Sequence, residues 1–196
     1  MLKMGTLPSM ESMRSLGNRP RVHPNGFIQL DLSDRVRLHV WHPKLPFRQD
    51  SYSPVHDHIF SFDSFVFSGR LVHVPYVTSR CENGTHERWQ VRGAGPGETT
   101  VLENVGSGPE RLHPMSAWIV QPGDSYHFEK YVLHETLANE PTMTMMWKEP
   151  FDGQKVGTNC MGTSVMVPVG SQPDNEFVRE DFPADMLWTL IEEAHP

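Results

Sequence analysis

Short apolar runs separated by turn residues extend over most of the chain. In residues 35–42, Val36, Leu38 and Val40 alternate with polar or aromatic side chains, which is the period of a strand with one buried face. A turn at 68–70 is expected to join two paired strands. About ten short strands at this spacing favour an all-β sandwich or barrel of jelly-roll type. The other runs that predict strands lie at 27–32, 55–69, 70–77, 86–92, 99–105, 116–121, 125–138 (two strands), 142–148 and 163–169.

The two ends of the chain depart from this pattern. Residues 1–20 lack periodicity, so we expect a flexible segment or an arm over the barrel or a partner subunit. Within 182–194 the apolar residues share one helical face, which predicts a helix on the outside of the barrel (Met186, Leu187, Leu190 and Ile191). The expected organisation is a flexible segment at 1–20, one barrel domain at 21–180 and a C-terminal helix at 181–196.

Length, charge and cysteine content narrow the class of protein. The 196 residues suit a single domain with a substantial core. A net charge of −7 disfavours a nucleic-acid partner. No run approaches the roughly 18 apolar residues of a membrane span, and the start lacks the apolar core of a signal peptide. Cys81 and Cys160 are expected to be free thiols in a reducing compartment. These features predict a soluble, cytoplasmic protein.

Among the eleven histidines, His56 and His58 form an HxH pair on a predicted strand. Since side chains two residues apart on a strand share one face, both imidazoles can reach one metal ion. Neutral imidazole suits Fe, Cu, Ni and Zn. The alternative is a pair of hydrogen-bonded histidines near a barrel mouth.

The stretch HDHIFSFDSFVFSG (56–69) resembles the first motif of the cupin superfamily, which is HxH, a spacer, usually Glu, and then a hydrophobic strand ending in a glycine turn. The resemblance covers about residues 35–150 and implies a cupin jelly-roll barrel that holds one metal ion. The position of the usual Glu falls on Phe62. Asp63 is one residue out of register and is expected to face the other way. A three-histidine site, similar to that of thiol dioxygenases, therefore fits better than a site with a carboxylate.

The third histidine has two candidates in the second motif that the resemblance implies, SYHFEKYVLHET (125–136). His134 directly precedes the late strand run, which is the place the resemblance favours. His127 follows Pro122 by five residues, in a pattern loosely like PxGxxH. The expected metal ligands are His56, His58 and His134, with His127 as the alternative third ligand.

Further residues are candidates for a substrate pocket. Arg37, His39 and Trp41 share one face of a predicted strand, which either points inward or is an outward polar face. If it points inward, His39 can orient a ligand and Arg37 can hold a substrate carboxylate. Tyr76 is a candidate catalytic residue at the pocket wall. Three other strand aromatics are also candidates for the pocket wall (Trp89, Tyr126 and Trp147). Four further histidines are interpreted as surface residues (His73, His86, His113 and His195).

Three neutral ligands leave open coordination positions and a net positive metal centre, which favours an anionic or bidentate small-molecule substrate. Together with the resemblance, which implies the reaction class, this leads to the hypothesis of a mononuclear non-haem oxygenase of dioxygenase type, with Fe(II) as cofactor, or with Mn, Ni, Cu or Zn in its place, and O₂ as co-substrate. The alternatives are a metal-dependent lyase, isomerase or hydrolase, and a non-catalytic small-molecule-binding barrel. The resemblance also implies a homodimer.

Overall fold

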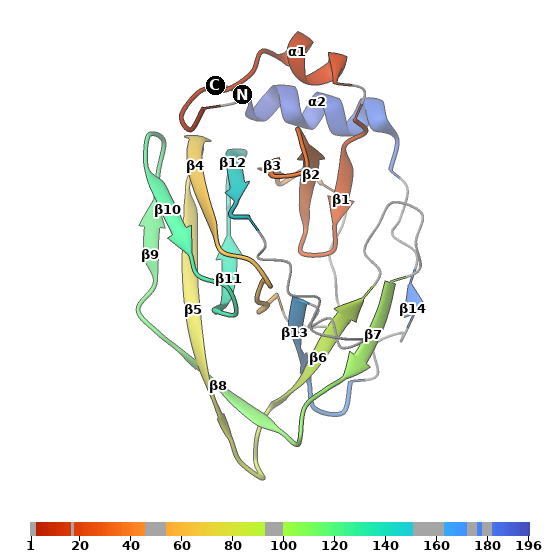
Figure 1. Cartoon of the computed structure of the whole chain (residues 1–196), viewed down its shortest axis with the longest axis vertical. Coiled ribbons are helices and arrows are strands. Elements are labelled where there is room, and N and C mark those ends of the chain that lie inside the picture. Colours follow the sequence, from red (N-terminus) through yellow and green to blue (C-terminus); the bar gives the residue numbers. More distant parts are fainter. Residues whose placement is uncertain are drawn as a thin grey trace.

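The computed structural model describes residues 3–16, 18–45, 54–92, 100–150, 163–171, 176–177 and 182–196. Its strands form two antiparallel sheets that enclose the centre of the molecule (Figure 1). The six-stranded sheet has the order β1 (Arg21–His23), β2 (Phe27–Asp31), β3 (Val36–Trp41), β12 (Thr142–Lys148), β4 (Phe62–Ser68) and β10 (Ser125–Phe128).

The second sheet has eight strands, and its main path has the order β11 (Leu133–Leu137), β5 (Leu71–Arg80), β8 (Glu110–Pro114), β6 (His86–Arg92), β7 (Thr100–Asn104) and β14 (Glu176–Phe177). Two more strands join it at the side, since β13 (Thr163–Pro168) pairs with β6 and β9 (Trp118–Val120) pairs with β5.

The chain crosses repeatedly from one sheet to the other. Strands β10, β11, β12 and β13 follow one another in sequence and lie alternately in the first and the second sheet. The segment around His56 adds to this pattern, because His56 bridges His134 of β11 on one side and Val165 of β13 on the other. This alternation is the winding of a jelly roll. The expected all-β jelly roll with a C-terminal helix is confirmed.

The predicted strand at 55–69 is divided between the two sheets. Only Phe62–Ser68 forms a strand of the six-stranded sheet, whereas His56 makes isolated bridges in the other sheet. The turn at 68–70 is present, with Gly69 at φ 69°. The prediction that it joins paired strands is wrong, because β4 and β5 lie in different sheets. The turn carries the chain across the sandwich edge, where Gly69 packs against Pro141 and Thr142.

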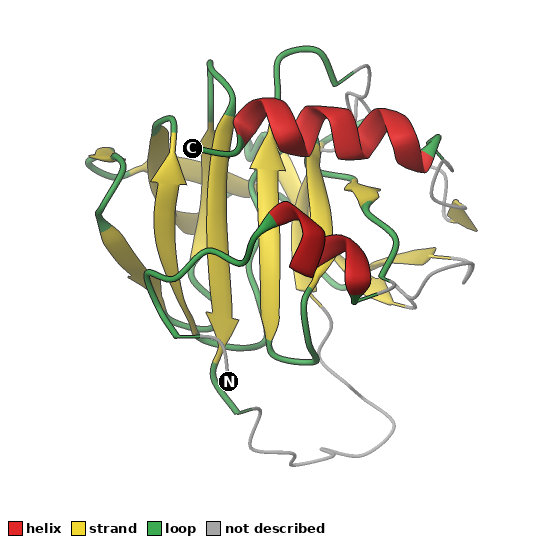
Figure 2. Cartoon of the chain, turned by 90° about the horizontal axis from the view of Figure 1, so that it is seen from above, coloured by secondary structure: helices red, strands yellow, loops and turns green. Residues whose placement is uncertain are grey.

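Both helices lie across the outer face of the six-stranded sheet, as Figure 2 shows. Helix α2 (Ala184–Ala194) matches the predicted C-terminal helix and buries its apolar face against β2, β3 and β12 (Leu187, Trp188, Leu190, Ile191 and Ala194). The short helix α1 (Met10–Ser15) falls in the segment that was expected to be flexible or an arm over the barrel. Its Met13 is 0% exposed and belongs to the same core cluster, so at least this part of the segment packs over the sheet.

The two faces of β3 therefore have different partners. Val36, Leu38 and Val40 pack toward the helices, whereas His39 and Trp41 face the space between the sheets. Within the described residues, no helix is both long enough and apolar enough to cross a bilayer. Cys81 is a free thiol, and Cys160 lies outside the described residues.

Candidate metal centre

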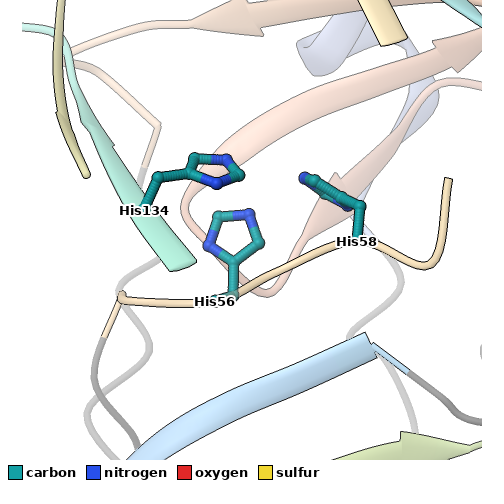
Figure 3. Close-up of side chains that lie close together, drawn as sticks. All are labelled: His56, His58 and His134. Atoms are coloured by element: carbon teal, nitrogen blue, oxygen red, sulfur yellow. The ribbon is translucent and has the colours of Figure 1, made fainter. Parts of the chain in front are cut away.

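Three histidines meet between the sheets. The Nδ1 or Nε2 atoms that His56, His58 and His134 offer all lie within 4.8 Å of one another. The ring centroids are 4.6 Å apart for His56 and His134, 4.9 Å for His56 and His58, and 5.3 Å for His58 and His134. Figure 3 shows the three rings pointing toward a common space, two from the 55–58 segment and one from β11. The predicted HxH pair and His134 are thus brought together.

Backbone hydrogen bonds hold these residues in place. The His56 N–H donates to the His134 carbonyl at 3.0 Å, and the His134 N–H donates to the His56 carbonyl at 2.9 Å. On the other side, the Asp57 N–H donates to the Ser164 carbonyl at 3.0 Å. Residues distant in sequence are therefore fixed opposite each other by the sheet itself.

The hydrogen bonds of the rings define which nitrogen is available. The Nδ1 atoms of His56 and His134 lie 2.8 Å from the Pro54 carbonyl and 2.9 Å from the Val132 carbonyl. A carbonyl oxygen only accepts, so each Nδ1 carries the proton and each Nε2 keeps a free lone pair. Histidines that bind metals are commonly oriented by such a backbone contact.

Burial keeps the three rings neutral. Desolvation lowers the pKa of His56 from its ordinary value. The pKa values of His58 and His134 lie well below 6.5, because burial disfavours the charged ring and because protonated neighbours, His56 above all, would repel it. Neutral imidazoles are the form that binds a cation, so the donor set fits one divalent metal ion.

Asp57 anchors the HxH segment from the opposite face. Its side chain is buried, and Oδ1 accepts a hydrogen bond from the Ser164 N–H at 2.7 Å. Its Oδ2 lies 3.8 Å from Arg88 Nη1, and Arg88 Nη2 lies 3.0 Å from Glu110 Oε2. Burial raises the pKa of Asp57 from its ordinary value. This network joins the segment that carries His56 and His58 to β6, β8 and β13.

Phe62, the position at which the sequence resemblance would expect a Glu, is 5% exposed, and its ring centroid lies 5.2 Å from that of His58. Asp63 faces away, and its Oδ1 is 3.0 Å from Nδ1 of His127. His127 and Asp63, with Glu149, form a second group of possible ligands on the protein surface. Neither His127 nor Asp63 joins the three-histidine cluster.

The other candidate site residues are separated from one another. His39 lines the same cavity as the three histidines, and burial, followed by the charge of Arg37, lowers the pKa of His39 to about 3. Arg37 is paired with Asp31, with Nε 2.9 Å from Oδ1. Tyr76 donates a hydrogen bond to Glu135 Oε1 at 2.7 Å and packs with Val55, outside the set of described residues that line the cavity. Burial, then this bond to Glu135, raises the pKa of Tyr76 to about 12.

His73 was interpreted as a surface residue, but it is 1% exposed and lines the cavity. Its Nδ1 lies 3.0 Å from Thr136 Oγ1, and its ring centroid is 4.3 Å from that of Tyr126. Burial lowers the pKa of His73 to about 4. The signal that indicates this position is the period of two in 70–77, which places His73 on the face of the buried Leu71.

The cavity itself is small, about 40 Å³. Aromatic side chains from both sheets form much of its wall (Phe27, Trp41, Phe62, Tyr126 and Phe128). Among the described residues that line it, none is an Asp, Glu, Lys or Arg. The described lining residues therefore carry no charged side chain, and their polar groups belong to the histidines, Asn25, Thr136, Tyr126 and Trp41.

Comparisons with known proteins show little. No protein-family model matches the chain, and no curated protein matches it. One similar solved structure is hydroquinone 1,2-dioxygenase from Sphingomonas sp. TTNP3 with 4-hydroxybenzoate bound, with a TM-score of 0.35, 8% identity, and coverage of 65% of this chain. The match spans 66% of that enzyme's chain, just under two thirds.

A second similar structure is hydroquinone 1,2-dioxygenase PnpCD in complex with Cd²⁺ and 4-hydroxybenzonitrile. Its TM-score is 0.35 at 11% identity, with coverage of 77% of this chain and 82% of that one. Similarity at this level identifies neither a reaction nor a substrate for the present chain.

Proposed function

We propose that this protein is a mononuclear non-haem metal-dependent oxygenase of the cupin type, in which His56, His58 and His134 hold the metal. The observation that supports this most strongly is the convergence of three neutral imidazoles between the two sheets, with His56 and His134 buried and His58 partly buried. Two of them have their Nδ1 atoms committed to backbone carbonyls, which leaves Nε2 for the ion.

The proposed cofactor is Fe(II), with Mn, Ni, Cu and Zn as other ions that this donor set accepts. When bound, an iron ion supplies the redox chemistry that activates O₂ next to a small organic substrate. Part of the wall around the histidines is apolar, since Phe62 and Phe128 are both buried beside the cluster. Exclusion of water protects reactive species from side reactions.

Three imidazoles are also the ligand set of zinc sites that activate a bound water molecule. The same observation therefore supports a second candidate function, a redox-neutral lyase, isomerase or hydrolase in which the metal is a Lewis acid. The identity of the metal and the use of O₂ distinguish the two candidates.

The first test is elemental analysis of the protein as purified and after anaerobic reconstitution with Fe(II), Mn, Ni, Cu or Zn. We expect one ion per chain and a rise in thermal stability, because a ligand that binds only the native state stabilises it. A protein that retains no ion and gains no stability from any of the five would refute both candidates.

The second test measures oxygen consumption by the iron-loaded protein with a panel of small carboxylates, thiols and phenols. Substrate-dependent consumption that disappears in His134→Ala supports the oxygenase. Turnover of a substrate without oxygen uptake, by the zinc-loaded or manganese-loaded form, favours the redox-neutral candidate instead.

The proposal includes a cytoplasmic location and a homodimer, which the sequence analysis expected. The free thiol of Cys81 is in keeping with a reducing compartment. Sedimentation of the purified protein tests the dimer, and fractionation of cells tests the location.

A further inference from the structure

Two more histidines reach the cavity of the three-histidine cluster, one from each sheet. His39 comes from β3 of the six-stranded sheet, and His73 comes from β5 of the other. Among the described residues, the Nε2 atom of each is buried and has no hydrogen-bond partner. Buried polar atoms are nearly always paired, so two unpaired imidazole nitrogens around one cavity indicate a missing partner.

Packing holds both rings in their present positions. His73 is fixed by the contact of Nδ1 with Thr136 Oγ1 at 3.0 Å and by the ring of Tyr126. The ring of His39 lies 4.7 Å from that of Phe27 and 5.9 Å, edge to face, from that of Trp41. The rings of Phe27 and Trp41 offer no acceptor to His39, and Nε2 of His73 has no hydrogen-bond partner although the Tyr126 ring lies beside it.

The charge of the cavity restricts what its ligand can be. A divalent ion held by three neutral histidines keeps its full charge in an enclosed space between the sheets, where an uncompensated charge is costly. Among the described lining residues there is no carboxylate to neutralise it. The missing compensation must come from the ligand, which is therefore an anion.

The size of the cavity restricts the ligand further. A water molecule needs about 10–15 Å³ of such space, and an engineered cavity of about 150 Å³ holds benzene. The cavity here measures about 40 Å³. It has room for the metal and a few additional ligand atoms, and it is too small for an aromatic ring.

We propose that the cavity binds a small carboxylate of a few non-hydrogen atoms, with one oxygen facing the metal and the Nε2 atoms of His39 and His73 hydrogen-bonding its polar atoms. This inference rests on the proposed function, because it needs a metal ion at His56, His58 and His134. It assigns His39 and His73 to ligand binding and not to metal binding.

The test is calorimetric titration of the metal-loaded protein with acetate, acetamide and benzoate. Acetate is expected to bind, whereas acetamide, which has the same shape without the charge, and benzoate, which exceeds the cavity, should bind at least about 10-fold more weakly. Equal affinity for acetate and acetamide would contradict the requirement for an anion, and benzoate binding as tightly as acetate would contradict the limit on size.

Substitutions then test the two histidines. In His39→Phe and His73→Phe the ring packing is kept and the nitrogen is lost, so acetate affinity should fall about 10- to 100-fold while metal content stays at one ion per chain. Glutamine places an amide nitrogen near the position of Nε2, so His39→Gln and His73→Gln should recover most of the acetate affinity. His113→Gln, at an exposed position, is the matched control and should match the unsubstituted protein.

The two proposals fail in different ways. If the unsubstituted protein binds no metal, the proposed function fails and this inference fails with it. If the metal binds and the folded Phe variants keep full acetate affinity, only this inference fails. Loss of the metal from folded His39→Phe or His73→Phe would also overturn it, because that residue would then belong to the metal site.

Discussion

His127 and Asp63 face each other across β10 and β4, with Nδ1 of the histidine 3.0 Å from Oδ1 of the aspartate. The next pair in the same register is Phe128 and Phe62, and both rings are buried beside the histidine cluster. Since successive side chains of a strand point to opposite faces, the pair of phenylalanines on the inside places His127 and Asp63 on the outside. The alternative third ligand His127 and the carboxylate of Asp63 thus point away from the cavity because each follows or precedes an inward-facing phenylalanine by one residue.

This register leads to a prediction about metal content. His56→Ala, His58→Ala and His134→Ala should each abolish metal loading, because two imidazoles hold an ion much less well than three. His127→Ala and Asp63→Ala should keep one ion per chain, and they serve as matched controls for the loss of a histidine and of a carboxylate. Inductively coupled plasma mass spectrometry measures the number of metal ions per chain. Retained metal in His134→Ala, or its loss in His127→Ala, would contradict the assignment.

The contact between His127 and Asp63 predicts a pH dependence. The hydrogen bond to Asp63 raises the pKa of His127 above 6.5, and Glu129 adds to the effect. A raised pKa means that the folded state binds the proton more tightly, so the stabilisation is complete below about pH 6.5 and is lost as the pH rises through the folded-state value. Both side chains are substantially exposed, so solvent screening should keep the effect below about 1 kcal/mol.

Proton NMR titration of His127 tests this expectation. The pKa should lie above the ordinary value in the unsubstituted protein and should return toward it in Asp63→Asn. If the two proteins titrate alike, Asp63 does not stabilise the protonated ring.

Asp57 is expected to support the metal centre indirectly. In Asp57→Ala the Ser164 N–H loses its buried acceptor and Arg88 loses one of its two carboxylate neighbours. We expect a loss of about 1–3 kcal/mol in the free energy of unfolding. Metal affinity should also weaken, because the HxH segment keeps its backbone hydrogen bonds and loses the side-chain contacts of Asp57 with Ser164 and Arg88. Glu82→Ala, at an exposed position, is the control, and an unchanged metal dissociation constant in Asp57→Ala would show that the anchor is dispensable.

Gly69 provides a test of the turn between the two sheets. Its φ of 69° is strained for other residues by about 1–2 kcal/mol, and a Cβ atom there would overlap Pro141 and Thr142. Gly123 has a φ of 93° but open space around it. Gly69→Ala should therefore lower the urea midpoint clearly more than Gly123→Ala does. Equal effects would mean that the overlap is relieved at no cost.

Met13 tests the packing of helix α1. Its side chain is fully buried in the cluster that includes α2, β2 and β3, so Met13→Ala should cost about 2–5 kcal/mol of unfolding free energy. Met4→Ala is the control, because Met4 is 46% exposed. Chemical unfolding measures both, and a negligible effect of Met13→Ala would mean that the core closes without the helix.

Most of the strands can be predicted from the sequence, because the alternation that marks a strand is visible among neighbouring residues, as in 35–42 and 142–148. Which strands pair with one another cannot be predicted from this local alternation. The run 55–69 is rich in aromatic residues and resembles one strand, yet it is shared between two sheets. The turn at 68–70 resembles that of a hairpin, although its two strands lie in different sheets. The sheet to which each of these segments belongs depends on pairing with strands that are distant in the sequence.

Some residues of the candidate site can likewise be predicted from the sequence, and others cannot. His56 and His58 are detectable from spacing alone, and the orientation of Asp63 follows from the register. The cavity role of His73 is less visible, since its burial depends on Tyr126 and Thr136, which are 53 and 63 residues away in the sequence. Met13 escapes a periodicity search because α1 has only six residues.

The position of His56 between His134 and Val165 has a consequence for the order of events in the cell. The HxH segment is made early during synthesis, but both strands that hold it are made late, so the pocket for the ion does not exist on the growing polypeptide. Contacts of such long sequence separation also form slowly in folding. On the proposal that these histidines hold an ion, the site and the strands that support it are complete only after translation has passed Val165.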